Sequence, residues 1–479
     1  MIMYKFKIYQ YLIPIGLCLA VVGCKTPAIA PTKASAPVPE SYADSKDTNT
    51  IATITWKNFF KDKNLADLID VALKNNQELL ITLQEIEIAK NDIRLRKGAL
   101  LPTVGVRAGA SVEKVGTYTS QGAGDASAEI TPGNRVPESL TDFNMALYAN
   151  WEVDIWKKLR NSKKAAISRY LSTIEGKNFV VTNLVSEVAN SYYELLAYDN
   201  QLDIVIQNIK LQQNALEIVK IQKDAARATE LAVQKFQAEV LSSQSMEFDI
   251  LQSIKETENR INFLLGRYPQ EIKREKTSFL SLVPATVNSG IPSQLLANRP
   301  DIKQAELELT AAKLDVKVAR AEFYPSLGIS SSFGVQAFKP SYLFTFPESL
   351  LYSLAGDLAG PLINRNAIKA EFNKANARQL QALYNYERTI LNAYLEVSTQ
   401  LSKISNLNTS YTLKTKQVDA LNKSIEFSND LFKSARVDYF EVLMTQRDAL
   451  QTKLELMDIK KEQLNAVVRV YRNLGGGWK

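Results

Sequence analysis

Histidine is missing from this 479-residue chain, and cysteine occurs only at positions 18 and 24. The chain therefore lacks the residues for a metal site built from histidine or cysteine, and it cannot activate a nucleophile with a histidine base. No glycine-rich phosphate loop of the P-loop type occurs either, so the sequence offers no nucleotide site. We expect no catalytic residue, cofactor or metal site, and enzyme functions fall behind transport and structural ones.

Proline and glycine are also missing from two long stretches. No proline lies between Pro137 and Pro269 or after Pro361, and no glycine lies between Leu362 and Leu474. Because both residues interrupt helices, these gaps indicate two very long helical regions. Apolar residues recur every seven positions in the first region, as in a coiled coil: Val181, Val188, Leu195, Leu202, Ile209 and Leu216. One helix over 157–227 would measure about 105 Å, too long for a compact soluble bundle.

These regions belong to an internal duplication. Residues 151–266 match residues 360–475 without a gap at an offset of 209. Residues 75–106 match residues 298–329 at an offset of 223. Each copy therefore predicts a helix, a strand, a loop, a second strand and two long helices, and we expect the copies to interlock in one fold.

Each pair of long helices is expected to turn once, near residues 224–229 and 433–438. Thr229 and Asp438 are placed to cap the returning helices. The returning helices run to Gly266 and Gly475, where glycine can close a helix. The sequence thus predicts two helical hairpins that point the same way.

Long apolar runs are missing from the four segments that alternate like strands. These segments lie near residues 103–118, 143–155, 326–337 and 350–363, and a loop over 120–138 joins the first two. Strands of about ten residues can cross a bilayer, but a membrane sheet must close, and four strands enclose no lumen. The chain must therefore oligomerise, or else form a soluble sheet covered by its helices.

The N-terminus has the pattern of a signal peptide. Lys5 and Lys7 precede an apolar run that ends at Val21-Val22-Gly23-Cys24. This motif resembles a bacterial lipobox, which implies cleavage before Cys24 and lipidation of its thiol; the alternative is an ordinary secretory signal with an incidental cysteine. Lys25 follows, which by resemblance to lipoprotein sorting favours the outer membrane, and a proline-rich tether extends to residue 45.

Five short motifs occur in a distinctive order along the chain: Trp151-Glu152-Val153-Asp154 with Leu159-Arg160, Leu264-Leu265-Gly266 with Pro269, the run Ile291 to Ile302, Phe323-Tyr324-Pro325-Ser326, and Leu474 to Trp478. They resemble the TolC-like outer-membrane factors, in the lipidated branch that serves resistance-nodulation-division efflux systems. The resemblance implies a mixed fold: a membrane β-barrel plus a long α-helical coiled-coil barrel through the periplasm. A homotrimer with four strands per protomer would form a twelve-stranded barrel, which supplies the closure that the strand count demands.

The same resemblance implies a gate near the helical tips. Family members narrow the tunnel with acidic rings in a segment that resembles residues 437–444. Glu441 takes the first acidic position, close to Asp438, whereas Met444 stands at the second. The resemblance therefore predicts one carboxylate ring with an apolar neighbour and weaker cation selectivity. The alternative is that Glu441 is a solvated carboxylate on a helix face.

The turns at the tips are candidates for contact with an adaptor protein. Ala226 and Ala435 stand where family members commonly have glycine, next to Arg227 and Arg436. Alanine at these positions predicts stiffer tips than is usual in the family.

The expected domain organisation follows the duplication. Its parts are a signal peptide at 1–23, a lipid-anchored tether at 24–45, a first repeat at 46–266, a linker at 267–292 and a second repeat at 293–479. The first repeat holds a β-hairpin at about 102–155 and a helical hairpin at about 157–266, and the second holds their counterparts at about 325–363 and 365–475.

The function predicted from the resemblance is a passive, gated exit duct of a tripartite efflux system. Its expected partners are two further copies of the chain, a periplasmic adaptor, an inner-membrane resistance-nodulation-division pump and outer-membrane lipid, without nucleic acid. Two alternatives stay open: an exit duct for protein secretion, and a non-conducting coiled-coil lipoprotein. Substrate choice is expected to lie mostly in the pump.

Overall fold

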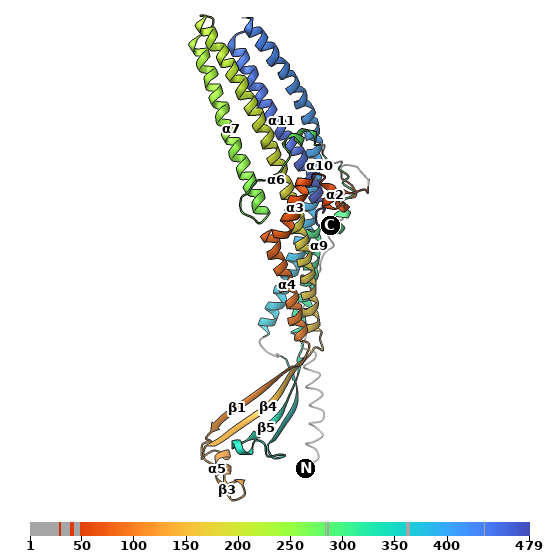
Figure 1. The fold of residues 1–479 in the computed structure, drawn as a ribbon. Helices are drawn as coiled ribbons and strands as arrows, with labels where there is room; N and C mark the ends of the chain where they lie inside the picture. Colours follow the sequence, from red (N-terminus) through yellow and green to blue (C-terminus); the bar gives the residue numbers. More distant parts are fainter. Residues whose placement is uncertain are drawn as a thin grey trace. The chain divides into compact units, whose positions relative to one another are not determined.

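The computed structural model describes residues 28–29, 39–42, 48–282, 284, 287–360, 365–434 and 436–479, and for 276–278 the backbone alone. Figure 1 shows the ribbon. Its main helices are α3 (Lys63–Asn75), α4 (Gln77–Gly98), α6 (Lys158–Asp224), α7 (Glu230–Leu264), α9 (Pro300–Ala321), α10 (Asn366–Lys433) and α11 (Tyr439–Asn473). The shorter helices are η1 (Ile51–Thr53), α2 (Trp56–Phe59), α5 (Ser120–Ser127), η2 (Lys276–Ser281), α8 (Gln294–Asn298) and η3 (Pro340–Tyr342). The strands are β1 (Thr103–Glu113), β2 (Glu129–Thr131), β3 (Asn134–Arg135), β4 (Leu140–Val153), β5 (Ser326–Ala337) and β6 (Leu350–Ala359).

The chain forms two compact units, where the sequence led us to expect one interlocked unit. The sheet unit contains Ile88–Tyr170 and Leu307–Leu383. The hairpin unit contains Leu171–Glu306 and Tyr384–Lys479, together with the described residues from 39 to 87. Each unit takes segments from both repeats, because the chain passes between the units within α4, α6, α9 and α10.

The duplication is visible in the element bounds. A shift of 223 residues carries α4 onto α9, and a shift of 209 residues carries α7 onto α11 with identical ends. The helices α6 and α10 span 67 and 68 residues, close to the expected 157–227 for the first. Among the described residues no helix is both long enough and apolar enough to cross a membrane.

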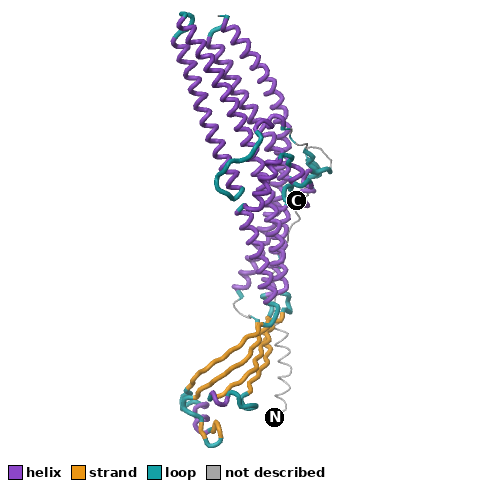
Figure 2. Tube along the Cα trace, viewed as in Figure 1, coloured by secondary structure: helices purple, strands orange, loops and turns teal. Residues whose placement is uncertain are grey.

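The sheet unit is built on one antiparallel sheet. Its strand order is β1-β4-β5-β6, so the two hairpins of the two repeats pair through β4 and β5. Figure 2 shows these strands in orange, together with the small hairpin of β2 and β3. Strand β1 ends at Glu113, earlier than the expected residue 118, and β6 ends at Ala359, while residues 361–363 of the expected strand lie outside the described part.

The expected loop over 120–138 contains regular structure, which corrects the sequence interpretation. Helix α5 forms there because the Thr119 hydroxyl accepts a hydrogen bond from the Gly122 amide at 3.1 Å. The short strands β2 and β3 follow it as a small hairpin with Gly133 at φ +77° in the turn. Glycine and alanine in this segment suggested an irregular loop, and the capping threonine overrides that tendency.

The long hairpins close with the same helix-ending motif in both repeats. At the end of α7 the Gly266 amide donates to Phe263 and the Arg267 amide donates to Asn262, both at 3.0 Å. The equivalent bonds at the end of α11 start from Gly475 and Gly476. Glycine is required at both ends, because φ is +65° at Gly266 and +91° at Gly475.

The hairpin unit holds most of the apolar core. One large cluster joins α3, α6, α7 and α11, and the heptad residues Val188 and Leu195 are fully buried in it. Their counterparts on α10 are less covered: Val397 is buried, whereas Ile404, Tyr411 and Val418 are only partly buried. The second hairpin therefore leaves more of its surface open than the first.

Candidate functional site

The main sheet has one apolar face and one polar face. Because side chains alternate along a strand, the strand register places these residues together on the apolar face: Val104, Val106, Val112, Met145, Leu147, Trp151, Ile329, Phe333, Tyr352, Leu354 and Leu358. The register places another set on the opposite face: Arg107, Asp142, Asn144, Tyr148, Asn150, Ser330, Ser332, Gln336 and Asp357. The apolar residues are exposed to a large extent, with Leu354 at 80% and Tyr352 at 77%.

The polar face is hollow. It borders a cavity of about 680 Å³ whose lining includes Asn144, Tyr148, Asn150, Ser332 and Gln336. Polar side chains also bond across this face, with the Gln336 amide 2.8 Å from the carboxylate of Asp142. Amide and hydroxyl groups on a concave surface suit a wetted passage, while the opposite face suits hydrocarbon.

A second candidate surface lies at the start of α11. Asp438, Glu441 and Asp448 are exposed and share one side of the helix, since they are three and seven residues apart. Val442, Leu443 and Gln446 point the other way and are buried. We name this surface, defined by Asp438, Glu441 and Asp448, the acidic face.

Packing behind the acidic face fixes its direction. Val442 and Leu443 join an apolar cluster with residues of α6 and α7, among them Val219 and Phe236. The ammonium group of Lys235 on α7 lies 5.3 Å from the ring centre of Phe440. These contacts hold α11 against the first hairpin and leave the carboxylates outward.

The structure distinguishes the residues predicted for the gate. Glu441 is exposed in the first turn of α11, and Asp438 occupies the N-cap position, but its side chain makes no capping hydrogen bond. The expected N-cap position of Asp438 is therefore confirmed without a capping bond, whereas the Thr229 hydroxyl does accept from the Ala232 amide at 3.3 Å. Met444 is half-buried and lies on the same side of the helix, three residues after Glu441 and four before Asp448.

The tip of the first hairpin is strained. Ala226 has φ +56°, a left-handed conformation that favours glycine. The neighbouring bonds repeat the helix-ending motif, with the Ala226 amide 2.8 Å from the Lys223 oxygen and the Arg227 amide 2.7 Å from the Gln222 oxygen. Arg227 and Arg436 are exposed at the two tips. Cys24 and Ala435 lie outside the described residues.

An ion-pair cluster in the second repeat escaped the sequence analysis. Arg299 is 5% exposed, and its guanidinium contacts Asp301 at 2.7 Å and Glu396 at 2.8 Å. It also donates to the backbone oxygen of Asn473 at 3.0 Å. Burial alone would lower the pKa of Arg299, and the two carboxylates more than offset this, so that its pKa is raised.

The first repeat has the same geometry without the cation. Asn76 stands at the position of Arg299 and donates to the Leu264 oxygen at 3.0 Å. Glu78 and Glu187 stand at the positions of Asp301 and Glu396. Partial burial raises the pKa of Glu187, and the nearby Glu78 carboxylate raises it further, whereas Arg472 and Arg260 lower it. An alignment of the two repeats around Asn76 and Arg299 would have shown this difference.

Comparisons with known proteins agree with this architecture. The model of a family described as outer membrane efflux protein matches residues 68–267 and 291–476. The chain belongs to the outer membrane efflux protein family. It therefore acts in export at the outer membrane, as the channel component of an efflux system.

Individual relatives of this efflux protein are similar over nearly their whole length. The cation efflux system protein CusC of Escherichia coli O6:H1 is 28% identical, over 98% of this chain and 99% of CusC. The pyoverdine export outer membrane protein OpmQ of Pseudomonas aeruginosa is 28% identical, over 97% of this chain and 96% of OpmQ. A crystal structure of CusC is 26% identical and covers 94% of this chain and all of its own, with a TM-score of 0.82.

Proposed function

We propose that three copies of this efflux protein assemble into one duct, in which twelve strands close a barrel in the outer membrane. Strands β1 and β6 are the edges of the described sheet, and each would pair with an edge of the next copy. The two-faced sheet supports this arrangement, because closing it with the apolar face outward puts Asn144, Asn150 and Ser332 around the passage.

The helices carry a second argument for the trimer. Leu413, Ala420 and Phe427 are seven residues apart on α10 and exposed, with Leu413 at 62% and Phe427 at 65%. Leu241 and Phe248 on α7 are likewise seven residues apart and exposed at 57% and 70%. Apolar heptad positions without a partner in the described chain suit coiled-coil packing against a neighbouring copy.

The partners follow from the tripartite assembly. A periplasmic adaptor would contact the tips around Arg227 and Arg436, and an inner-membrane resistance-nodulation-division pump would drive export. The names of CusC and OpmQ indicate different cargoes, cations and pyoverdine, at equal identity to this chain. The proposal therefore concerns the duct and leaves the cargo to the pump.

Conductance of the purified chain in planar bilayers tests the proposal. A duct passes ions, and its mass in detergent corresponds to three chains. A protein that stays monomeric, or a trimer that forms no conducting unit, would instead support the non-conducting lipoprotein.

A further inference from the structure

Positive charge gathers where the helices of the sheet unit meet its strands. Four helix ends lie next to the main sheet: α4 leads into β1, α6 follows β4, α9 leads into β5 and α10 follows β6. The stretches 94–97, 157–164, 313–320 and 365–374 hold three, five, three and three basic residues, against two acidic residues in all. We call these four stretches the basic belt.

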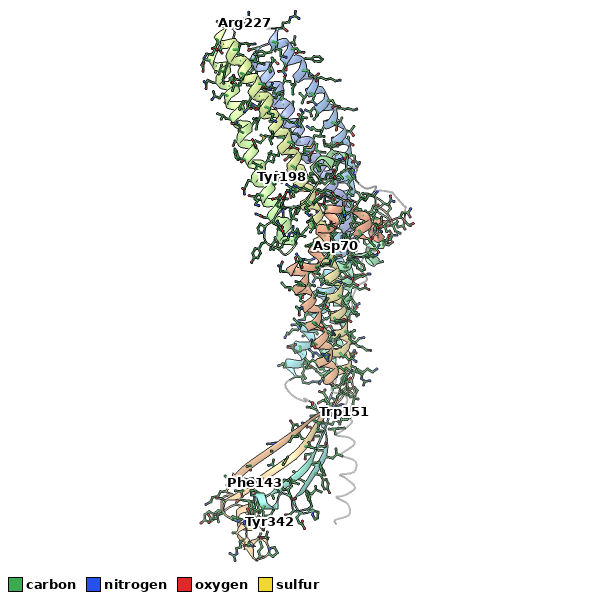
Figure 3. All side chains as sticks on the ribbon, viewed as in Figure 1. Asp70, Phe143, Trp151, Tyr198, Arg227 and Tyr342 are labelled. Atoms are coloured by element: carbon green, nitrogen blue, oxygen red, sulfur yellow. The ribbon has the colours of Figure 1, made fainter. Side chains whose placement is uncertain are left out.

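Contacts within the unit bring the four stretches to one end of the sheet. Arg96 near the end of α4 donates to the Ser162 hydroxyl of α6 at 3.2 Å. Arg365 before α10 donates to the backbone oxygen of Phe323 after α9 at 2.8 Å. Figure 3 places Trp151 at this end of the sheet, where the strands meet the helices, and Phe143 and Tyr342 further along the sheet.

Internal ion pairs account for only part of this charge. Arg160 is held by Asp154 at 2.9 Å and Lys158 by Glu152 at 2.5 Å. Lys97, Lys164, Lys317 and Lys369, one from each helix end, are exposed, and none has a carboxylate partner in the described part of the chain.

Helix electrostatics does not explain the charge either. Neither α6 nor α10 has an acidic residue in its first turn, although the positive end of a helix favours acids. Basic residues at these N-terminal ends lie where the helix dipole disfavours them. An anionic partner outside the chain would offset this repulsion.

Aromatic residues at the same end indicate what this partner is. The indole of Trp156 stacks on Tyr324 at 4.8 Å and donates to the Pro325 oxygen at 2.7 Å. Trp151 donates to the Leu100 oxygen at 3.1 Å and belongs to the apolar face of the sheet. Trp151 and Trp156 are 38% and 45% exposed. Tryptophan with its polar edge bonded and its ring exposed is typical of the boundary between hydrocarbon and headgroups.

We propose that the basic belt binds the phosphate groups of anionic phospholipids in the leaflet that faces the helices. This inference rests on the proposed membrane position of the sheet. The aromatic pair sets the depth of the sheet, and the lysines just beyond it reach the lipid phosphates. The belt would enrich anionic lipid around the duct and oppose movement of the strands along the membrane normal.

Tryptophan fluorescence of the full-length protein in detergent micelles tests the proposal. Brominated phosphatidylglycerol and brominated phosphatidylcholine are titrated separately, since bromine quenches nearby indoles. The unmodified protein should prefer phosphatidylglycerol, and more weakly as salt is raised. Changing Lys97, Lys164, Lys317 and Lys369 together to Gln should weaken that binding by at least about tenfold.

Two matched variants complete the experiment. Changing Lys210, Lys255, Lys416 and Lys423 to Gln removes the same charge from exposed positions in the hairpin unit and should leave the preference unchanged. Changing the four belt lysines to Arg should retain it. Equal losses in the belt and control variants, or an unmodified protein with no preference for the anionic lipid, would overturn the proposal.

Further arms separate the remaining explanations. Competition by inorganic phosphate as effective as that by the lipid would show a free phosphate site and overturn the lipid assignment. Conductance is measured on the same preparations: a conducting protein without lipid preference contradicts the belt alone, whereas a protein that never conducts contradicts the duct itself.

Discussion

The guanidinium of Arg299 donates a hydrogen bond to the backbone oxygen of Asn473 at 3.0 Å. It ties the start of the second repeat to the last residue of α11, while Asp301 and Glu396 balance its charge. The first repeat makes the same connection with a neutral side chain, from Asn76 to Leu264. The two repeats therefore share a structural joint whose charge differs.

Removing the cation should be costly. Arg299→Met leaves Asp301 and the backbone oxygen of Asn473 without their donor, and we expect a loss of about 3 kcal/mol in unfolding free energy. Urea denaturation followed by circular dichroism measures it. Asn76→Ala, the matched change in the first repeat, should cost about 1–2 kcal/mol, because it removes a neutral hydrogen bond. Equal costs at the two positions would contradict the role assigned to the charge.

The two equivalent glutamates should respond in opposite directions to the loss of charge. Glu187→Gln relieves repulsion by Glu78 and should raise stability at neutral pH, whereas Glu396→Gln removes a partner of Arg299 and should lower it. The pKa of Glu187 is raised above 4.5 in the folded chain, so the folded state binds this proton more readily than the unfolded state. The associated stability is present below about pH 4.5 and is lost as pH rises through the higher folded pKa. Thermal unfolding across this range should show that dependence in the unmodified chain and a weaker one in Glu187→Gln.

Glycine at the tip of the first hairpin should relieve strain. Ala226 adopts φ +56°, which costs an L-residue about 1–2 kcal/mol, so Ala226→Gly should stabilise the turn by about 0.5–1 kcal/mol after the entropy of glycine is counted. Hydrogen exchange of the last turn of α6 should slow. Ala225→Gly, one residue earlier and without a positive φ, should speed exchange there. Faster exchange in Ala226→Gly would count against the strain.

The acidic face should govern ion selectivity if it borders the throat of the trimer. Three Glu441 carboxylates would concentrate negative potential there and attract cations, because a narrow cleft with low-dielectric walls focuses the electric field of its charges. Glu441→Gln should lower cation preference and weaken block by multivalent cations in single-channel recordings, with little effect on trimer stability. Glu239→Gln changes the counterpart of Asp448 in the first repeat and should do much less. The reverse ranking would place the constriction on the other hairpin.

Lipidation is tested by one substitution. Cys24→Ala should abolish metabolic labelling with palmitate, because Cys24 is the thiol that follows the lipobox-like motif. Insertion of the strands should persist, since the apolar face of the sheet has its own membrane affinity. Labelling that continued unchanged would assign the lipid elsewhere and leave Cys24 incidental.

Long-range regularity in the sequence predicted most of the architecture. The offset of 209 placed the ends of α7 and α11, and the heptads anticipated Val188 and Leu195 in the core. Such signals survive because many residues obey the same period. The family resemblance predicted Glu441 for the gate, and its exposure on the acidic face agrees with that position without testing the role.

Features set by single side chains were not predictable in the same way. Helix α5 depends on the hydroxyl of Thr119, and the cluster at Arg299 joins residues 174 positions apart in the chain. Neither has a period of its own, and only a residue-by-residue alignment of the two repeats would have pointed to Arg299. The division into two units escaped notice because each unit interleaves segments of both repeats.

Helices α7 and α11 have equal lengths, and α6 and α10 have nearly equal lengths. The two helical hairpins therefore match in length, and the helix lengths set how far each hairpin extends. Inserting one residue in a helix advances its end by about 1.5 Å and rotates everything beyond it by about 100°, which would turn buried heptad positions toward solvent. Inserting seven residues nearly restores the rotation and only lengthens the arm. We therefore expect these arms to tolerate insertions of seven residues better than insertions of one, whereas the loop that holds α5 already differs in length from its counterpart between β5 and β6.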